Sequence, residues 1–437
     1  MNTDKMFKPF EICSIRPPTE NQSLTFRLTR NCYWNKCTFC PVYKLGSKFI
    51  KRSIDDVKSD IYFAKRLNDK LDEFKTASDV SGSLANPEAA EYHCAQEMIE
   101  QIQQAQGLET DYVNHAESVG VDTNLTDDPV TGWFMQWFKE TPTIADSVNH
   151  LVSWRLGGGR SCFLGDADSL ILKPLFVKEV IDTVKTSFPS IHRFTVYGRT
   201  VSASRLRTLS ELKEFRSAGL NRVHFGIESG SDAVLKRVCK GETKNDHISG
   251  CLKTKEAGLS CSIYVMPGLG GQQYSEEHAS ETADVITQTA PDFVRMRTLQ
   301  VFPNTPLAKQ REREVFVETT EEQVVSEIRQ MILKIDARTQ IISDSATNLL
   351  NVNGRLPEDR RAMLHMIDSY LALSLSQKKL FSLQIRLQAF EGQYGGFSED
   401  IYGKLMPFIN NATLDISSMP EATVDDLIYL IRSKLMP

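Results

Sequence analysis

Short apolar runs alternate with amphipathic segments through the middle of the chain. The runs are rich in β-branched and aromatic residues and predict strands at 23–30, 161–166, 192–198, 222–228, 259–266 and 293–302. Apolar positions with a helical period predict helices between them, at 174–188, 203–219, 245–258 and 275–289. Gly219 and Gly258 stand directly before strands, as helix C-caps do. Strands alternating with helices favour a parallel sheet, so the expected fold is α/β, a partial (β/α)6 TIM-like barrel.

Two regions depart from this rhythm. Residues 67–149 predict a helical insertion after the first strand–helix unit, with helices at 93–106 and 132–140 around an acidic, turn-rich segment. The insertion is either a decorating subdomain or a lid over a substrate. From Thr319 onward the pattern is all-helical, with helices at 321–335, 357–374 and 423–435. We therefore expect an N-terminal lead at 1–20, a barrel at 21–310 and a helical C-terminal tail at 311–437 that covers the open sheet edge.

Composition narrows the class of protein without naming a function. The chain has 437 residues, a formal net charge of -5 and a pI near 6.0, so no overall charge attracts nucleic acid or anionic membrane. No apolar run is long enough to span a membrane, and the N-terminus has no signal-peptide core. Nine cysteines, an odd number, argue against a disulfide scaffold. We expect a cytoplasmic protein without a membrane partner.

Three cysteines, Cys32, Cys37 and Cys40, lie together in the loop that follows the first predicted strand. Closely spaced thiolates bind zinc, copper(I) or iron–sulfur clusters. Structural zinc and simple electron-transfer clusters usually take four protein ligands. Three thiolates on one loop favour a cubane cluster that leaves one iron open, at the strand end where parallel barrels carry their active sites. Structural thiols, or zinc completed by a distant residue, remain alternatives.

This loop and several later motifs resemble the radical S-adenosylmethionine (SAM) superfamily over most of residues 21–310. The resemblance is to the Elp3-, MiaB- and coproporphyrinogen-oxidase-like branch, and within it to a bacterial subgroup. It implies that Cys32, Cys37 and Cys40 hold a [4Fe–4S] cluster whose fourth iron binds S-adenosyl-L-methionine, with the aromatic Phe39 before the last cysteine. The first gap between cysteines has four residues where the family has three.

The resemblance also implies cofactor contacts at the ends of the early strands. Gly165 and Asp166 take the place of the turn that meets the SAM amino group, with Asp168 as a neighbouring candidate. An ordinary βα turn explains this segment nearly as well. Arg199 would pair with the SAM carboxylate through its planar guanidinium, although a solvated arginine is equally compatible with its position.

Further contacts are implied after the fourth and fifth predicted strands. Glu228 and Ser229, in "IESGSD", match the positions that bind the ribose, and a buried unpaired carboxylate would be costly in a packing role. Met266 and Gly268, in "VMPGLGG", match the positions that flank the adenine. The remaining cysteines form no second cluster motif, and the resemblance assigns no catalytic residue.

The resemblance implies an iron–sulfur oxidoreductase-like enzyme. Its reduced cluster would cleave SAM to a 5′-deoxyadenosyl radical that abstracts hydrogen from an unknown small-molecule or peptide substrate, with flavodoxin or ferredoxin as reductant. One alternative is a tRNA-modifying radical SAM enzyme, although no basic RNA-binding module is apparent and nucleic acid is not expected as a partner. The other is a non-enzymatic iron–sulfur electron carrier, which would need a fourth protein ligand.

Overall fold

The computed structural model describes residues 7–13, 15–42, 48–77, 87–106, 142–303, 305–410 and 413–435. The helix predicted at 132–140 and the acidic segment before it lie outside these ranges. The choice between a lid and a decorating subdomain therefore stays a prediction. None of the helices within the described ranges combines the length and hydropathy needed to cross a membrane.

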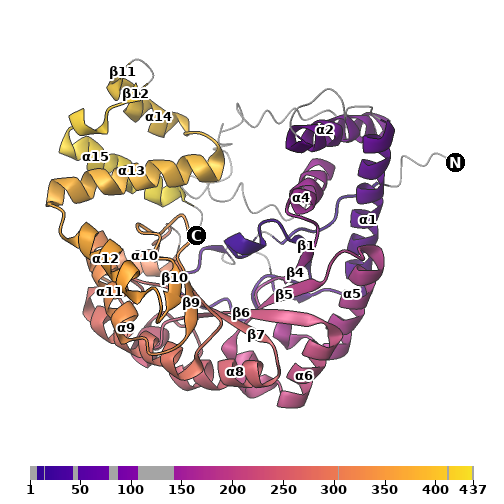
Figure 1. Ribbon diagram of the computed structural model, residues 1–437, viewed down its shortest axis with the longest axis horizontal. Helices are drawn as coiled ribbons and strands as arrows, with labels where there is room; N and C mark the ends of the chain where they lie inside the picture. The colour runs from indigo at the N-terminus through magenta and orange to yellow at the C-terminus, as the bar shows by residue number, and fades with distance from the viewer. Residues whose placement is uncertain are drawn as a thin grey trace.

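The described strands form one large sheet that bends into an arc, with helices along its outer face (Figure 1). The strands follow the order β1 (Leu24–Arg27), β4 (Ser161–Gly165), β5 (Arg193–Gly198), β6 (Leu220–Glu228), β7 (Ser260–Val265), β8 (Phe293–Met296), β9 (Thr339–Ile342) and β10 (Gly354–Leu356). Neighbours run parallel from β1 to β9, and β10 pairs antiparallel to β9. This confirms the predicted α/β class and partial barrel.

The helices between the strands are those that the apolar periodicity predicts. They are α5 (Pro174–Ser187), α6 (Leu209–Ala218), α8 (Lys244–Glu256) and α9 (Gly271–Thr289), with the short α7 (Asp232–Arg237) after β6. Helix α6 begins later than predicted because Thr208 caps it, in a capping box with Glu211. Gly219 ends α6 in the left-handed region at φ 113°, which confirms its predicted role as a C-cap.

Alternate strand positions divide the barrel into an apolar outside and a polar inside. Phe194, Val196 and Ile263 are fully buried or nearly so and pack in the core beneath the helices. Tyr197 and Tyr264 lie on the inner faces of β5 and β7, which point into the barrel. Their ring centroids are 6.3 Å apart. TIM-type barrels usually fill this interior with branched aliphatic side chains. This barrel instead has an interior that can receive a polar ligand.

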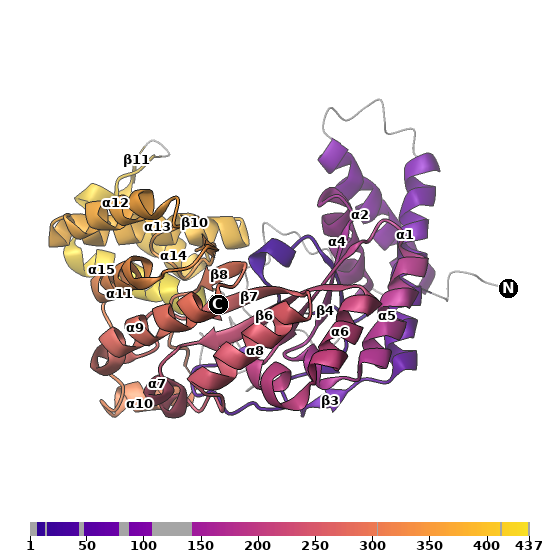
Figure 2. The same cartoon turned by 60° about the horizontal axis from the view of Figure 1, so that its bottom comes forward.

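The predicted helical insertion is present between β1 and β4. Its described helices, α1 (Ile54–Ala77), α2 (Pro87–Gln106) and α4 (Ile144–Leu156), pack on one another beside the β1 end of the sheet (Figure 2). Helices α1 and α4 extend across residues 67 and 149, so these two boundaries fall inside helices. The short antiparallel strands β2 (Thr29–Arg30) and β3 (Ile50–Lys51) flank the cysteine loop, and α1 follows β3.

The C-terminal region is mainly helical, as predicted, but the prediction of an all-helical pattern after Thr319 is wrong. It contains α10 (Pro306–Glu312), α11 (Glu321–Lys334), α12 (Arg360–Leu371), α13 (Leu375–Tyr394), α14 (Glu399–Leu405) and α15 (Glu421–Lys434), and a hairpin of β11 (Ile409–Asn410) and β12 (Thr413–Leu414). It also supplies β9 and β10 to the barrel sheet. The edge beside β8 is therefore extended by strands, where the sequence predicted a cover of helices.

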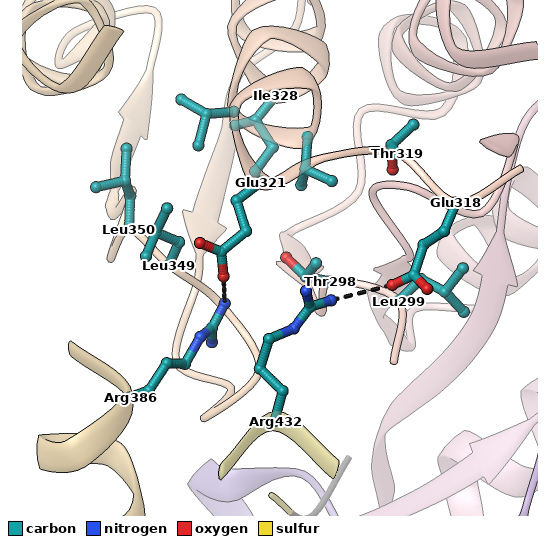
Figure 3. Close-up of a pocket in the computed structure, with 12 residues that line it drawn as sticks. Thr298, Leu299, Glu318, Thr319, Glu321, Ile328, Leu349, Leu350, Arg386 and Arg432 are labelled. Atoms are coloured by element: carbon teal, nitrogen blue, oxygen red, sulfur yellow. Dashed lines mark hydrogen bonds and ion pairs between the residues drawn. The ribbon is translucent and has the colours of Figure 1, made fainter. Parts of the chain in front are cut away.

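Helices α13, α14 and α15 have a separate apolar core. Ion pairs join them to the barrel, and Figure 3 shows two of these. Arg386 of α13 donates to Glu321 at 2.9 Å, and Arg432 of α15 donates to Glu318 at 3.1 Å. The Arg386 side chain is almost fully buried, and it also donates to the carbonyl oxygen of Thr347 at 2.9 Å. The N-terminal end of α11 therefore holds the C-terminal helices against the barrel.

Strand β9 can be tested as part of the barrel core. Ile341 is fully buried, and its truncation in Ile341→Ala should lower the free energy of unfolding by about 2–5 kcal/mol, the usual cost of a large core cavity. Leu375 is 66% exposed on α13, so Leu375→Ala should change it by less than about 0.5 kcal/mol. Urea unfolding followed by circular dichroism measures both. Equal effects of the two substitutions would mean that β9 does not pack as described.

Candidate functional site

The cysteine loop leaves the end of β1 and is held in place by two segments that come much later in the chain. The backbone N–H of Thr38 donates to the carbonyl oxygen of Val238 at 2.9 Å, and the Trp34 indole N–H donates to that of Cys239 at 2.8 Å. The backbone N–H of Leu307 donates to the carbonyl oxygen of Thr38 at 3.0 Å. The shape of the loop therefore depends on tertiary contacts.

Trp34 fits closely against a glycine and an arginine. Gly241 has φ +69°, and a Cβ added there would lie 2.1 Å from the indole ring, so the close approach requires glycine. On another side, the guanidinium carbon of Arg199 lies 4.9 Å from the ring centroid, within the range of a cation–π contact. Trp34 therefore connects the cysteine loop to the end of β5 and to the segment after α7.

The three loop cysteines are half-buried, form no disulfide, and line one pocket of about 170 Å³ at the carboxyl ends of the barrel strands. The described residues that line it are Ile15, Cys32, Trp34, Cys37, Phe39, Cys40, Pro41, Val42, Ala167, Tyr197, Gly198, Arg199, Gly226, Glu228, Lys240, Tyr264 and Arg297. This lining holds no fourth cysteine and no histidine. Three thiols facing one cavity are the donor set that an iron–sulfur cluster with an open corner requires.

The same thiols do not form a site for a single metal ion. Within the described ranges, no three His, Cys, Asp or Glu side chains converge closely enough to hold one ion. Zinc needs its ligands to meet at one point, whereas each cysteine of a cubane binds a different iron.

Burial changes the protonation of the loop. It raises the pKa of Cys37 to about 12, although the nearby charges of Lys240 and Arg199 act in the opposite direction. Without metal, the Cys37 thiol keeps its proton at neutral pH. Metal binding must displace that proton, since the thiolate is the ligand.

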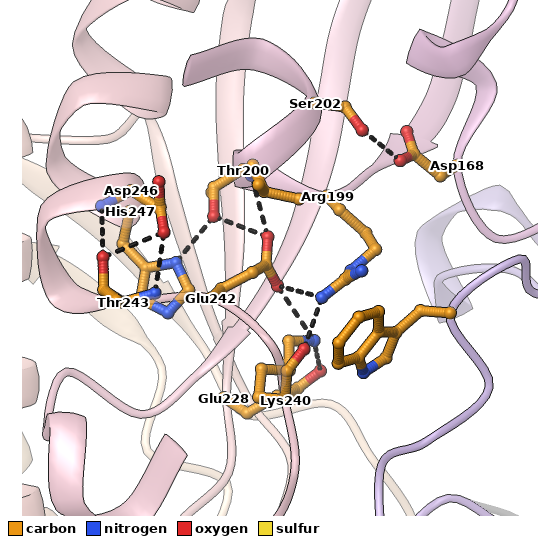
Figure 4. Close-up of polar contacts among 12 residues, drawn as sticks. Asp168, Arg199, Thr200, Ser202, Glu228, Lys240, Glu242, Thr243, Asp246 and His247 are labelled. Carbon is orange, nitrogen blue, oxygen red and sulfur yellow. Dashed lines mark hydrogen bonds and ion pairs between the residues drawn. The ribbon is translucent and has the colours of Figure 1, made fainter. Parts of the chain in front are cut away.

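Four buried charged side chains form a cluster beside the cysteine loop, and we call Arg199, Glu228, Lys240 and Glu242 the charge cluster (Figure 4). The Lys240 Nζ lies 3.2 Å from Glu228 Oε1 and 3.7 Å from Glu242 Oε2. The Arg199 Nη2 lies 3.3 Å from Glu242 Oε2. Burial alone would raise the pKa of Glu242, but Lys240 and Arg199 hold it below its usual value. Two cations and two carboxylates thus balance one another in a largely buried position at the pocket wall.

Glu228 reaches this cluster through an unusual backbone. It has φ 63°, a left-handed conformation rare for a residue with a side chain, and the pairing of β6 with β7 shifts register between Gly226 and Glu228. Irregularities of this kind re-aim side chains at the ends of strands and are common at functional sites. Here the irregularity accompanies a carboxylate that lines the pocket.

The structure brings six of the sequence-predicted site residues to the pocket and leaves five outside its lining. The six are Cys32, Cys37, Cys40, Phe39, Arg199 and Glu228. Asp166 is instead buried, where its Oδ2 accepts from Arg27 at 2.7 Å and from the backbone N–H of Asn31 at 3.1 Å. Gly165 packs against Cys13, whose sulfur would lie 2.2 Å from an added Cβ. The roles of Gly165 and Asp166 in SAM binding stay predictions.

Ser229, Met266 and Gly268 lie behind the pocket wall. The Ser229 hydroxyl is buried, 2.8 Å from His278 Nδ1. Met266 packs in an apolar cluster with Phe39, and Cys37 and Cys40 contact that cluster. The backbone N–H of Gly268, at φ +87°, donates to Glu327 Oε1 at 2.6 Å. Their contacts with SAM likewise stay predictions.

Sequence reasoning missed Lys240, Glu242 and Arg297, three charged residues of this region. Lys240 and Glu242 flank Gly241 directly after α7, and Arg297 follows the end of β8. One signal in the sequence could have identified them. Each of these charged residues follows soon after the end of a helix or strand, α7 for Lys240 and Glu242 and β8 for Arg297. Lys240 pairs with Glu228 of β6 and Glu242 pairs with Arg199 after β5, so no local pattern identifies these two pairings.

Residues 120–283 match the family model of the Radical SAM superfamily. The match covers less than half of the chain, and over these residues it confirms the predicted resemblance to the radical SAM superfamily. The matched residues cover β4 to β7 and begin after the three-cysteine loop.

Similarity to individual proteins is limited to part of the chain. Biotin synthase 2 of Frankia casuarinae is 24% identical over 131 residues, which cover 30% of this chain and 33% of that protein. The tRNA uridine(34) acetyltransferase of Methanocaldococcus infernus is 27% identical over 120 residues, or 27% of this chain and 22% of that protein. The solved structure of Methanocaldococcus infernus Elp3 with an N-terminal deletion has a TM-score of 0.38 and 18% identity, and covers 51% of this chain and 57% of that one. The chain thus spans no more than a third of the curated relatives named.

The pH dependence of stability can test whether Glu327, whose carboxyl accepts a hydrogen bond from the backbone N–H of Gly268, is neutral when buried. Burial raises the pKa of Glu327 from 4.5 to about 7. The stability that its neutral form provides is complete below the unfolded-state pKa and is lost as pH rises through about 7. Glutamine cannot ionise, so Glu327→Gln should gain roughly 2–3 kcal/mol relative to the wild type between about pH 5 and pH 8. Urea unfolding at both pH values measures the difference.

The matched control for this prediction is Glu322→Gln, since Glu322 lies on the same helix with its side chain half exposed. Its difference from the wild type should stay nearly constant over this pH range. A Glu327→Gln difference that is equally flat would contradict a neutral buried carboxyl at this position.

Two glycine-to-alanine substitutions test the contact between Trp34 and Gly241. Gly241→Ala adds both positive-φ strain and a collision with the indole, whereas Gly258→Ala, at φ +80° with its nearest atom 3.8 Å away, adds the strain alone. We expect Gly258→Ala to cost about 1 kcal/mol and Gly241→Ala about 1–3 kcal/mol more. Chemical unfolding measures both, and equal losses would show that Trp34 is not held tightly.

Proposed function

We propose that this chain is a radical SAM enzyme that holds a [4Fe–4S] cluster on Cys32, Cys37 and Cys40. When bound, the cluster supplies the electron for reductive cleavage of SAM to a 5′-deoxyadenosyl radical, which abstracts hydrogen from the substrate. The observation that carries this proposal is a pocket lined by three cysteines that form no disulfide, with no fourth cysteine or histidine in its described lining. The match of residues 120–283 to the Radical SAM superfamily model supports the same chemistry.

The residues around the loop would hold the cluster and control its surroundings. The cations of Arg199 and Lys240 lie near the Cys37 sulfur, so they would favour its thiolate and offset negative charge on the cluster. Phe39 and Met266 form the apolar cluster that Cys37 and Cys40 contact, which would limit access of water from that side. The protein thereby supplies a partly dry site with positive charge on one side.

The polar pocket residues would orient SAM beside the cluster. Arg199 presents a guanidinium that can pair with a carboxylate, and Glu228 presents a carboxylate that can accept from ribose hydroxyls or an ammonium. Gly165, Asp166, Ser229, Met266 and Gly268 are also proposed contacts on the strength of the motif resemblance. For those behind the pocket wall, such contact requires the wall to adjust when SAM binds.

The enzyme is favoured over an electron carrier for a chemical reason. A carrier protects its cluster with four protein ligands, and the described lining of this pocket offers three thiols. An open iron is useful to an enzyme because a ligand of the reaction can occupy it. We further propose a cytoplasmic enzyme that acts on a small molecule or peptide and takes electrons from a flavodoxin or ferredoxin.

Cluster assembly and SAM cleavage test the proposal together. After anaerobic reconstitution the wild type should bind about four irons per chain, and with dithionite and SAM it should release 5′-deoxyadenosine. Cys37→Ala removes a cluster ligand, so iron should fall to less than about half and 5′-deoxyadenosine should become undetectable. Iron analysis and chromatography of the nucleoside measure the two outcomes.

Cys239→Ser is the control, because the Cys239 side chain is exposed and this residue contacts the loop through its backbone carbonyl oxygen. It should keep both the iron and the cleavage activity. A wild type that binds zinc in place of iron, or a loaded cluster that leaves SAM intact under strong reductant, would refute the proposed function.

A further inference from the structure

Two arginines at the barrel interior have no acidic partner among the residues that the structure describes. Arg297 follows the end of β8 and lines the pocket, and no described carboxylate lies within ion-pair distance of it. Arg16 lies close to Tyr197, and its Nε is buried without a hydrogen-bond partner in the described ranges. The hydrogen bond of Arg16 is from Nη1 to the carbonyl oxygen of Cys13, at 3.1 Å. Both guanidinium charges therefore act on the interior without compensation.

Other arginines of the barrel interior are neutralised, which makes these two stand out. Arg27 pairs with Asp166 at 2.7 Å, and Arg295, two residues before Arg297 on the same strand face, pairs with Asp344 at 3.0 Å. Arg199 and Lys240 are balanced within the charge cluster. A buried or half-buried cation without a counter-charge is costly unless a ligand supplies one.

Hydroxyl groups accompany the free charge. Tyr264 lines the pocket, and its hydroxyl is buried and makes no well-formed hydrogen bond to a described residue, although the Tyr197 hydroxyl is its neighbour. Arg297 lies close enough to lower the pKa of both phenols against the larger effect of burial, which raises them. A cation beside buried phenolic donors is a site for an anionic oxygen.

We propose that Arg297 and Tyr264 bind a carboxylate or phosphate group of the substrate, with Arg16 adding positive charge from behind Tyr197. This inference rests on the proposed function, because it places that group in the pocket that the cysteine loop shares. It assigns an anionic substrate to the enzyme and gives it a fixed orientation relative to the cluster.

The charge of SAM separates this site from the cofactor site. SAM carries a sulfonium, an ammonium and one carboxylate, so a SAM molecule whose carboxylate pairs with Arg199 has no second anionic group to offer Arg297. Its carboxylate would be held near the cysteine loop, where Arg199 lies against Trp34. Arg297 lines the same pocket as Tyr197 and Tyr264. The free charge there calls for a second, anionic ligand.

Isothermal titration calorimetry with inorganic phosphate and with malonate, as separate probes, tests the site. The full-length chain is titrated without a cluster and again after reconstitution. We expect at least one probe to bind the wild type with a Kd of about 1 mM or lower, and Arg297→Gln to weaken it about tenfold or more, as loss of a charged hydrogen-bond donor does. Tyr264→Phe removes one hydroxyl and should weaken it by about threefold to tenfold.

The control is Arg329→Gln, which removes an exposed arginine that pairs with Asp368 at 2.6 Å on the outer helices. Probe binding should not change in this variant, and Arg297→Gln should keep the iron content and the SAM affinity of the wild type. A response to malonate alone indicates a carboxylate substrate, and one to phosphate alone a phosphorylated substrate.

Three results would overturn the inference. They are the absence of binding by both probes, an unchanged affinity in Arg297→Gln, and competition between either probe and SAM. The titrations without a cluster do not depend on iron, so a failure to assemble the cluster would refute the proposed function separately.

Discussion

The buried charge cluster is the constraint on which the candidate site depends. Its four side chains are largely buried, so each needs an opposite charge beside it. Lys240 meets this need by binding Glu228 at the end of β6 and lying near Glu242, which fixes the segment after α7 against the barrel. The same segment accepts hydrogen bonds from Trp34 and Thr38 of the cysteine loop. Charge balance inside the barrel thereby determines where the loop cysteines lie.

Alternate residues of the barrel strands have different roles: those that face outward stabilise the fold, and those that face inward line the candidate site. Side chains such as Phe194 and Val196 pack under the helices and provide the hydrophobic contribution to folding. Their neighbours Thr195 and Tyr197 face inward, where they need not fill space as aliphatic side chains would. The interior can therefore change its polar groups without loss of the main core. This division allows one barrel to accept different substrates while its architecture stays the same.

Local patterns in the sequence predicted most of the barrel and the chemical part of the site. Apolar periodicity located the strands and helices from β4 to α9, and the spacing of Cys32, Cys37 and Cys40 identified the loop that lines the pocket. Strands β9 and β10 were missed because four and three residues are too few to establish a period against helical surroundings. The orientations of Asp166 and Ser229 could not be predicted, since each depends on a partner distant in sequence, Arg27 and His278 respectively. Pairing between distant residues is what a single sequence conceals.

The residues that hold the cysteine loop lie about 200 residues or more after it in the sequence, and this affects how the protein matures. The loop is made early during synthesis, but the carbonyl of Val238 and the N–H of Leu307 that hold it are added far later. A nascent chain that ends before these residues carries three accessible thiols in an unshaped loop, vulnerable to oxidation or to capture by zinc. For the proposed iron–sulfur cluster, loading with iron and sulfide would therefore belong after translation, when the completed barrel has closed around the loop.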